Sequence, residues 1–330
     1  HTPCKAHAMP SGYRVFCGGH HLSVSIKDIA RRAGVSHSTV SRALSGSPLV
    51  NRDTKTRIQA LARVMGYAPS AVARAMSTGR TRTLGLVVTT IADPFCGEVV
   101  RGIEETALDL DYNVILCSSN GDPERELAAV RTLRAKWVDA LIVTSSWVGG
   151  FYDQLTELHA PVVLINNQQP GEYTYSVRND DLRGGALAGE YLANLGHTRI
   201  AYVTGPQRAM ASQLRLRGCQ EALGAREIAI SKNWIVAGTG LPEAGERAVE
   251  ALLHASPRPT ALFCYNDATA MGALHAAKSA GLCVPGDLSI LGYDDIAAAP
   301  YLDPPLTTVA QKKYALGQQA TEMALALIQG

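Results

Sequence analysis

The pattern of hydrophobic positions changes once along the chain. Between residues 25 and 66, apolar side chains recur three or four positions apart, which is the spacing of amphipathic helices. From residue 83 onward, short continuous apolar runs alternate with helical stretches. Continuous apolar strands separated by helices are typical of parallel sheets that are covered on both faces. The pattern predicts a small all-α head followed by a larger α/β body.

Three short helices are expected in the head. Ser25 begins a capping box with aspartate three positions later, and Gly34 stands where a helix commonly ends. Ser36 is a good N-cap for a second helix, from His37 to about Leu44. The third helix is expected from about Arg52 to Met65. Two of these helices are thus joined by a tight turn that contains glycine.

The body contains enough alternating segments for two lobes. Its expected strands are 83–89, 113–118, 139–144, 161–166, 199–204, 260–264 and 288–292. Helical stretches between them include 98–110, 124–136, 182–195 and 267–280. Because ligands of open α/β sheets bind at the carboxyl ends of the strands, we expect a binding cleft between the lobes.

The chain divides into four segments by these patterns. Residues 1–24 have no useful periodicity and are expected to form a flexible leader. Cys4-His7 and Cys17-His20 in that leader resemble zinc-ligand pairs, but the surrounding sequence favours a disordered tail, so no metal site is predicted. The remaining segments are a helix-turn-helix domain (25–69), a hinge helix with its linker (70–82) and the two-lobed domain (83–330).

Composition places the chain among soluble globular proteins, with 46% hydrophobic and 18% charged residues. No apolar run approaches the roughly 20 residues of a membrane span. The N-terminus lacks a continuous apolar stretch of the signal-peptide type. The seven cysteines are scattered and indicate a reducing compartment, so a cytoplasmic protein without membrane contact is expected.

Charge is distributed unevenly along the chain. Residues 25–82 carry eleven Lys or Arg and two acids, a net charge of +9, whereas residues 83–330 carry −9. A basic head on an acidic body suggests a polyanion that contacts the head alone. The alternative is an ordinary solvated charged surface.

The segment IKDIARRAGVSHSTVSRAL adds a second sign of DNA binding. Its second helix is predicted to bury Val40, Ala43 and Leu44. Small polar residues and an arginine would then be exposed and could enter the major groove, namely His37, Ser38, Ser41 and Arg42. A three-helix bundle that makes no DNA contact is the alternative.

Residues 25 to about 320 resemble the lactose-repressor (LacI/GalR) family of transcriptional regulators. The matching segments follow in order: IKDIARRAGVSHSTVSRAL, GYAPSAVARAM, LGHTRIAYVTGP, CYNDATAMGAL, LGYDDI and PPLTTV. The resemblance implies a helix-turn-helix head with a hinge helix, followed by a two-lobed, periplasmic-binding-protein-like sensor with parallel sheets.

The resemblance also implies roles for residues of the head and hinge. Ser36, Thr39 and Arg42 match the recognition helix that contacts phosphates and bases, and His37 and Ser38 match the positions that choose the operator sequence. Three further positions match a phosphate contact and the hinge helix that enters the minor groove: Tyr67, Ala73 and Met76. Met76 stands where a leucine wedge is usual and can intercalate or only pack between the two hinge helices. Ser45 replaces the usual asparagine.

In the body, Asn166, Asn266 and Asp294 follow apolar strands, where either ligand contacts or helix caps are expected. The resemblance implies effector contacts at Thr89, Asp93, Phe95, Asn166, Arg215, Asn266 and Asp294. Gly240 occupies the family's aromatic stacking position, so a platform for a sugar ring is missing there. The chain ends at Gly330 without the family's usual terminal strand segment, so a divergent or truncated C-terminal lobe is expected.

These observations predict a homodimeric regulator, most simply a repressor, that binds a pseudo-palindromic double-stranded operator. Its affinity for DNA would be controlled by a small-molecule effector, a sugar or a related polar metabolite. A solute-binding protein of a transport system is the alternative, but it would need a signal peptide and no basic head. An enzyme is not expected, because the chain has no G-x-S-x-G, H-E-x-x-H or Walker motif, and no cofactor is implied.

Overall fold

The computed structural model describes residues 24–67, 79–148, 160–169 and 174–330. It divides the chain into two compact units, residues 1–77 and 78–330, and each is considered by itself. The expected leader and most of the expected hinge, including Ala73 and Met76, lie outside the described residues. No described helix is long and apolar enough to cross a membrane.

The head consists of the three expected helices, α1 (Ile26–Ala33), α2 (His37–Leu44) and α3 (Arg52–Val64). Its core is formed by the buried apolar faces of all three, with Ile29, Val40 and Ile58 fully enclosed. The period of three to four residues in the sequence therefore corresponds to one shared interior. We expect this small core to be sensitive to the loss of any one of these side chains.

The helix boundaries of the head follow from local hydrogen bonds. The amide and hydroxyl of Ser25 both donate to Asp28 Oδ2, at 3.0 and 2.6 Å, which confirms the expected capping box. Gly34 ends α1 in a left-handed conformation with φ +66°, which glycine adopts without steric cost. Ser36 caps α2 by accepting a hydrogen bond from the Thr39 amide.

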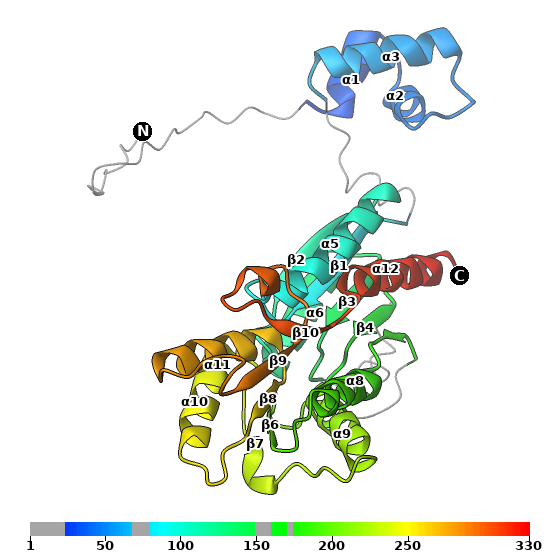
Figure 1. Ribbon diagram of the computed structural model, residues 1–330. Helices are drawn as coiled ribbons and strands as arrows, with labels where there is room; N and C mark the ends of the chain where they lie inside the picture. Colours follow the sequence, from blue (N-terminus) through cyan, green and yellow to red (C-terminus); the bar gives the residue numbers. More distant parts are fainter. Residues whose placement is uncertain (1–23, 68–78, 149–159, 170–173) are drawn as a thin grey trace, which may run out of the picture. The chain divides into compact units, whose positions relative to one another are not determined.

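The first lobe of the body is a parallel sheet in the order β2-β1-β3-β4-β5. The five strands are β1 (Thr83–Val88), β2 (Asn113–Ser118), β3 (Ala140–Thr144), β4 (Val162–Ile165) and β5 (Ser176–Val177). Helices α5 (Pro94–Asp109) and α12 (Lys313–Gln329) pack side by side on one face of it (Figure 1). Helix α6 (Pro123–Ala135) covers the other face. The last described helix thus completes the first lobe.

The second lobe repeats this topology, with the strand order β10-β9-β8-β6-β7. Its strands are β6 (Ile200–Val203), β7 (Ile235–Val236), β8 (Ala261–Cys264), β9 (Ser289–Asp294) and β10 (Thr307–Ala310). One face is covered by α8 (Asp181–Asn194) and α9 (Met210–Gly224), and the other by α10 (Pro242–Leu253) and α11 (Asp267–Ser279). Short 3-10 turns, η1 (Lys232–Trp234) and η2 (Ala299–Tyr301), precede β7 and β10.

The expected two-lobed parallel α/β body is therefore confirmed. In each lobe the chain order reverses on either side of the first strand, and such a switch point leaves a crevice at the carboxyl ends of the strands. The segments that follow these strand ends are therefore the ones expected to line that crevice.

Candidate functional site

The exposed face of α2 is polar. His37, Ser38, Ser41 and Arg42 are exposed, whereas Val40 and Ala43 of the same helix are fully buried. This is the division predicted from the sequence. Among the described residues, the Arg42 side chain has no hydrogen-bond or ion-pair partner, so its charge is directed at solvent.

Two other cations of the head make internal contacts. Arg57 Nη2 donates to the carbonyl of Ala33 at 3.1 Å, and Lys55 Nζ donates to the carbonyl of Gly46 at 3.1 Å. These bonds join α3 to the turn after α1 and to the loop after α2. They therefore fix the segments that lie directly before and after α2.

The start of α2 is organised by hydroxyl groups. Ser36 Oγ accepts from the amide of Thr39 at 3.2 Å and lies 2.8 Å from the hydroxyls of both Ser38 and Thr39. The first amides of the helix have no intrahelical acceptor, so this end can also contact an anion. Tyr67 is half-buried, and its side chain packs against the hydrophobic core of the head.

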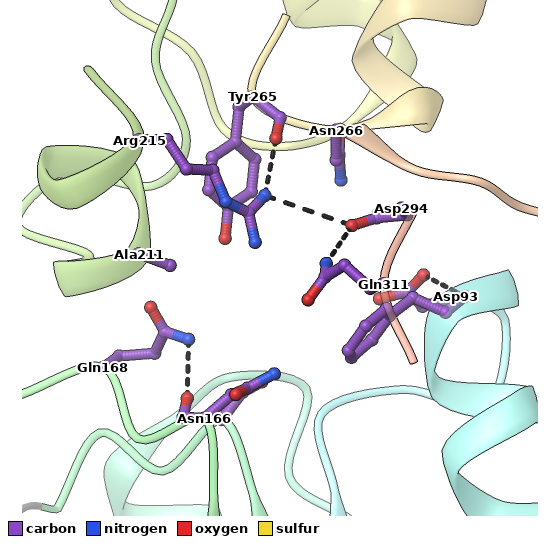
Figure 2. Close-up of a pocket in the computed structure, with 11 residues that line it drawn as sticks. Asp93, Asn166, Gln168, Ala211, Arg215, Tyr265, Asn266, Asp294 and Gln311 are labelled. Atoms are coloured by element: carbon purple, nitrogen blue, oxygen red, sulfur yellow. Dashed lines mark hydrogen bonds and ion pairs between the residues drawn. The ribbon is translucent and has the colours of Figure 1, made fainter. Parts of the chain in front are cut away.

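A pocket of the body lies at the carboxyl ends of strands from both sheets (Figure 2). Its empty volume is about 420 Å³, part of which is open to solvent. It is lined by Asp93, Phe95, Ser145, Asn166, Gln168, Ala211, Arg215, Tyr265, Asn266, Asp294 and Gln311. Six of the seven residues proposed from the sequence as effector contacts are brought together here.

Thr89 is the exception, because it does not line the pocket. Its carbonyl accepts hydrogen bonds from Ser118 Oγ at 2.8 Å and from the amide of Asn120 at 2.6 Å. The residue therefore ties the end of β1 to the end of β2 and the loop after it, and neither of its two partners lines the pocket.

Arg215 is the central charged group of the pocket. Its Nε donates to Asp181 Oδ1 at 2.8 Å and its Nη1 to the carbonyl of Tyr265 at 2.6 Å. Asp294 Oδ1 lies 4.0 Å from Nη1, and the guanidinium stacks 3.7 Å above the centre of the Tyr293 ring. Since the Arg215 side chain is only 5% exposed, this buried charge depends on its carboxylate partners.

Two glycines explain how Asp181 and Arg215 meet. A Cβ on Gly185 would lie 2.0 Å from the carbonyl oxygen of Arg215, and one on Gly218 would lie 1.9 Å from that of Leu182. Both distances are far too short for a real contact, so α8 and α9 approach each other only because these residues lack side chains. The approach brings the first turn of α8 against the middle of α9.

Asp294 is buried at the end of β9. Burial raises its pKa to about 8, although the nearby Arg215 acts in the opposite direction. Gln311 Nε2 donates to Asp294 Oδ1 at 2.5 Å, and Lys313 Nζ donates to the carbonyls of Asp294 and Asp295 at 2.5 and 2.6 Å. These bonds link the second lobe to the first turn of α12.

Three pocket residues have backbone conformations in the left-handed region. Ser145 has φ +49°, Asn166 has φ +47° and Asp294 has φ +122°. Each stands at the end of a strand, where the chain turns sharply. Such conformations cost on the order of 1–3 kcal/mol each. They turn the chain away from the sheet at the edge where the pocket lies.

Asp93 and Asn266 combine the two roles that the sequence left open. Asp93 caps α5 by accepting from the Phe95 amide at 3.0 Å, and burial raises the pKa of its carboxyl. Asn266 caps α11 through the amide of Thr269 at 2.9 Å, while its Nδ2 donates to the carbonyl of Gly240 at 3.0 Å. Both residues nevertheless line the pocket, so capping fixes side chains that a ligand can also contact.

Sequence reasoning missed Ser145, Gln168, Ala211, Tyr265 and Gln311. Four of them directly follow or lie close behind predicted or observed strands, which is the signal that could have found them. Ala211 has no polar group and leaves no such signal. Tyr265 matters most, because its ring lies beside Gly240, the position without an aromatic side chain: a Cβ on Gly240 would be 3.3 Å from that ring.

No metal centre is indicated in the described part of the chain. None of its His, Cys, Asp and Glu side chains form a group of three or more that could hold a metal ion. The two Cys-His pairs of the leader lie outside the described residues.

Comparison with known proteins identifies both parts of the chain. The model of the lacI family of bacterial regulatory proteins matches residues 25–70, and that of the periplasmic binding protein-like domain matches residues 190–330. The chain is 37% identical over 307 residues to the HTH-type transcriptional repressor PurR of Proteus mirabilis, covering 91% of this chain and 89% of that protein. The chain belongs to the lacI family. It is also 37% identical over 301 residues to the ribose operon repressor of Haemophilus influenzae, covering 91% of each.

A solved structure of a lacI-family protein shows the same architecture. The crystal structure of the lac repressor dimer bound to operator and the anti-inducer ONPF matches with a TM-score of 0.83 and 28% identity, and covers 94% of each chain. The predictions of a helix-turn-helix head, a periplasmic-binding-protein-like body and a transcriptional regulator are thereby confirmed. These lacI-family relatives are repressors rather than enzymes.

Proposed function

We propose that this lacI-family protein is a homodimeric transcriptional repressor whose affinity for a double-stranded operator is set by a small effector in the body pocket. The observation that carries the proposal is the polar, exposed face of α2, with Arg42 unpaired among the described residues and aimed outward. In this role His37 and Ser38 select the base sequence, and Ser36, Thr39 and Tyr67 position the head on phosphates. Ala73 and Met76 act in the hinge at the minor groove.

The effector part of the proposal is supported by the pocket. Asp93, Phe95, Asn166, Arg215, Asn266 and Asp294 line one pocket, in contact with both lobes. A ligand that contacts both lobes stabilises one relative orientation of them, and this is the differential binding that allostery requires. Thr89, to which the family resemblance also assigns an effector contact, does not line the pocket. A sugar or related polar metabolite fits the amide, carboxylate and guanidinium groups.

The domain boundaries proposed with this function are 25–69 for the DNA-binding head, 70–82 for the hinge and 83–330 for the sensor, after a leader of residues 1–24. A partner that is chromosomal DNA also implies a cytoplasmic location. The proposal includes no catalytic step and no cofactor. The alternative, a solute-binding protein of a transport system, would leave the basic head without a role.

The test is selection from random double-stranded DNA by the full-length protein, followed by titration of the enriched sequence. We expect a palindrome, and we expect Arg42→Ala to weaken binding to it by about 1–3 kcal/mol, roughly 5- to 150-fold. Arg217→Ala removes the same charge from an exposed position on α9 and should leave the affinity unchanged. No enriched sequence from a folded, dimeric protein would refute the proposal, and equal effects of the two variants would remove Arg42 from the interface.

A further inference from the structure

Residues 79–82, the described end of the expected linker, are fastened to the body by one carboxylate. Asp139 Oδ1 accepts hydrogen bonds from the amide and the hydroxyl of Thr81, both at 2.8 Å, and Asp139 Oδ2 accepts from the amide of Arg82 at 2.9 Å. Hydrogen bonds to an ionised acceptor are roughly twice as strong as those between neutral groups. Asp139 therefore binds two consecutive linker residues, one with each of its oxygens.

Further contacts fix the same junction. The hydroxyl of Thr81 also lies 2.8 Å from the carbonyl of Trp137, and Thr83 Oγ1 donates to the carbonyl of Thr81 at 3.2 Å. Arg80 Nη2 donates to the carbonyl of Ile328, near the end of α12, at 2.9 Å. The amide, hydroxyl and carbonyl of Thr81 thus all have partners in the body, so the chain leaves the first lobe from a defined place.

Asp139 belongs to the rigid part of the first lobe. It stands directly before β3, and its own amide donates to the carbonyl of Thr83 in β1 at 2.8 Å. All five residues of β3 are buried, and the strand is followed by Ser145, which lines the pocket. The contact that holds the linker and a residue of the pocket therefore lie at opposite ends of one buried strand.

The place where the linker leaves the body limits the reach of the head, because the linker is the only covalent connection between them. In a homodimer, two such places limit the distance between the heads, and hence between the half-sites that they bind. An extended chain spans at most about 3.3–3.6 Å per residue, close to the rise of about 3.4 Å per base pair. Releasing residues 79–81 would therefore give each head up to roughly 10 Å of additional reach, or about three base-pair steps.

We propose that Asp139 is a positioning residue that restricts this protein to one spacing of the two operator half-sites. By holding Thr81 and Arg82 on the first lobe, it prevents residues 79–82 from adding to the reach of the heads. An operator with displaced half-sites can then be bound only if the protein or the DNA is distorted, which weakens binding. The inference rests on the proposed function of the protein as a homodimeric operator-binding repressor.

Hydrogen exchange of the full-length protein without DNA tests the contact itself. Asp139→Ala removes the acceptors of the Thr81 and Arg82 amides, so these two amides should exchange at least tenfold faster than in the wild type. Asp111→Asn is the matched control, because Asp111 pairs with the Arg82 side chain at 3.2 Å in an exposed position and binds no linker amide. Asparagine also tolerates the left-handed conformation of residue 111, with φ +61°. Unchanged exchange in Asp139→Ala would show that Asp139 does not hold the linker, and the inference would be wrong.

Operator spacing tests the consequence for DNA binding. The probes are the palindrome enriched by the full-length protein and the same palindrome with one base pair inserted at its centre. The insertion moves the half-sites apart by about 3.4 Å and rotates one against the other by about 35°. For the wild type and Asp111→Asn, we expect the longer operator to bind at least tenfold more weakly. For Asp139→Ala, we expect this difference to fall to threefold or less. A mere loss of stability would weaken binding to both operators by the same factor and leave their ratio unchanged.

Asp139→Asn provides a second, more conservative variant in case the alanine variant does not fold. Its remaining Oδ1 can still accept from Thr81, but its Nδ2 cannot accept from the Arg82 amide, so the ratio of the two affinities should be intermediate. The inference is wrong if the Asp139 variants discriminate between the operators as the wild type does, or if the wild type binds both equally. An enriched palindrome with unchanged ratios refutes the inference alone. No enriched palindrome from the folded wild-type protein refutes the proposed function, and the inference with it.

Discussion

Replacing Arg215 by methionine should destabilise the body strongly, and by an amount that depends on pH. Methionine retains an unbranched side chain of similar reach, so packing on the Tyr293 ring is largely kept. The change removes the donors to Asp181 Oδ1 and to the Tyr265 carbonyl, at 2.8 and 2.6 Å. Asp181 is only 7% exposed and would be left buried without a cation.

The size of the destabilisation depends on whether the buried Asp181 carboxylate stays charged or takes up a proton, whichever costs less free energy. Breaking a buried pair by removing one partner costs about 3–5 kcal/mol. This destabilisation cannot exceed the cost of protonating the carboxylate. For an aspartate with the ordinary pKa of about 3.9, protonation costs about 4 kcal/mol at pH 7 and about 1.5 kcal/mol at pH 5. We therefore expect Arg215→Met to lower the free energy of unfolding by about 4 kcal/mol at pH 7 and by less than half of that at pH 5.

Urea unfolding followed by tryptophan fluorescence is a suitable assay, because all three tryptophans, Trp137, Trp147 and Trp234, lie in the unit of residues 78–330. Arg217→Met is the matched control on the same helix, since its ion pair with Glu221 is exposed and should contribute less than about 1 kcal/mol. The reasoning is refuted if Arg215→Met costs no more than this control, or if its cost does not fall between pH 7 and pH 5.

Two further predictions concern single contacts. Ser36→Ala removes the N-cap of α2 and should destabilise the helix by about 1 kcal/mol, which would speed hydrogen exchange of the α2 amides roughly fivefold. Ser41→Ala changes an exposed serine of the same helix and should not speed exchange. Equal exchange rates in the two variants would exclude the cap as a stabilising contact. The wild-type protein should lose stability as pH rises from 5 to 8, and the Asp294→Asn variant should not show this loss. Burial raises the folded-state pKa of Asp294 to about 8, so its stabilising contribution is present below the unfolded value near 3.9 and is lost as pH rises through 8. Urea unfolding at pH 5 and pH 8 should show the difference growing by up to about 4 kcal/mol, and a constant difference would contradict the assignment.

The head was predictable from its sequence because its signals are local. The inward face of α2, the capping box at Ser25 and the glycine after α1 each depend on residues within one or two helical turns. Strands β1, β3, β4, β6, β8 and β9 were also predicted close to their observed limits, since their continuous apolar runs are largely buried. Strand β2 was predicted equally well, although it lies at a sheet edge and is partly exposed.

Some elements that were not named individually from the sequence have mixed buried faces or are very short. Helix α9 turns Ser212, Arg215 and Gly218 inward, so its buried face does not look apolar. Helix α12 likewise buries Lys313 and Gly317. Strands β5 and β7 have only two residues each, and β10 has four partly exposed ones at a sheet edge. Their positions depend on pairing with distant strands, which local patterns do not encode.

The pocket shows the same limit. Asn166, Asn266 and Asp294 were proposed because they follow apolar strands, and Gln168, Tyr265 and Gln311 also lie just behind strands, so the same signal could have found them. The pairing of Arg215 with Asp181 spans 34 positions and depends on the close approach of α8 and α9 at two glycines. Such a contact becomes visible only once the helices are placed.

The position of α12 has a consequence for synthesis on the ribosome. The core of the first lobe combines Leu84 and Leu86 of β1 with Leu316, Ala320 and Leu325 of α12, so the lobe lacks part of its interior until α12 emerges. At usual elongation rates, the intervening 240 or so residues take roughly 12 to 50 seconds. The described core of the head is formed by residues between 24 and 67, so the head can fold during that interval. A nascent chain would therefore present a folded DNA-reading head well before its sensor is complete, and a chain interrupted before α12 would keep that head while losing the lobe next to it in sequence.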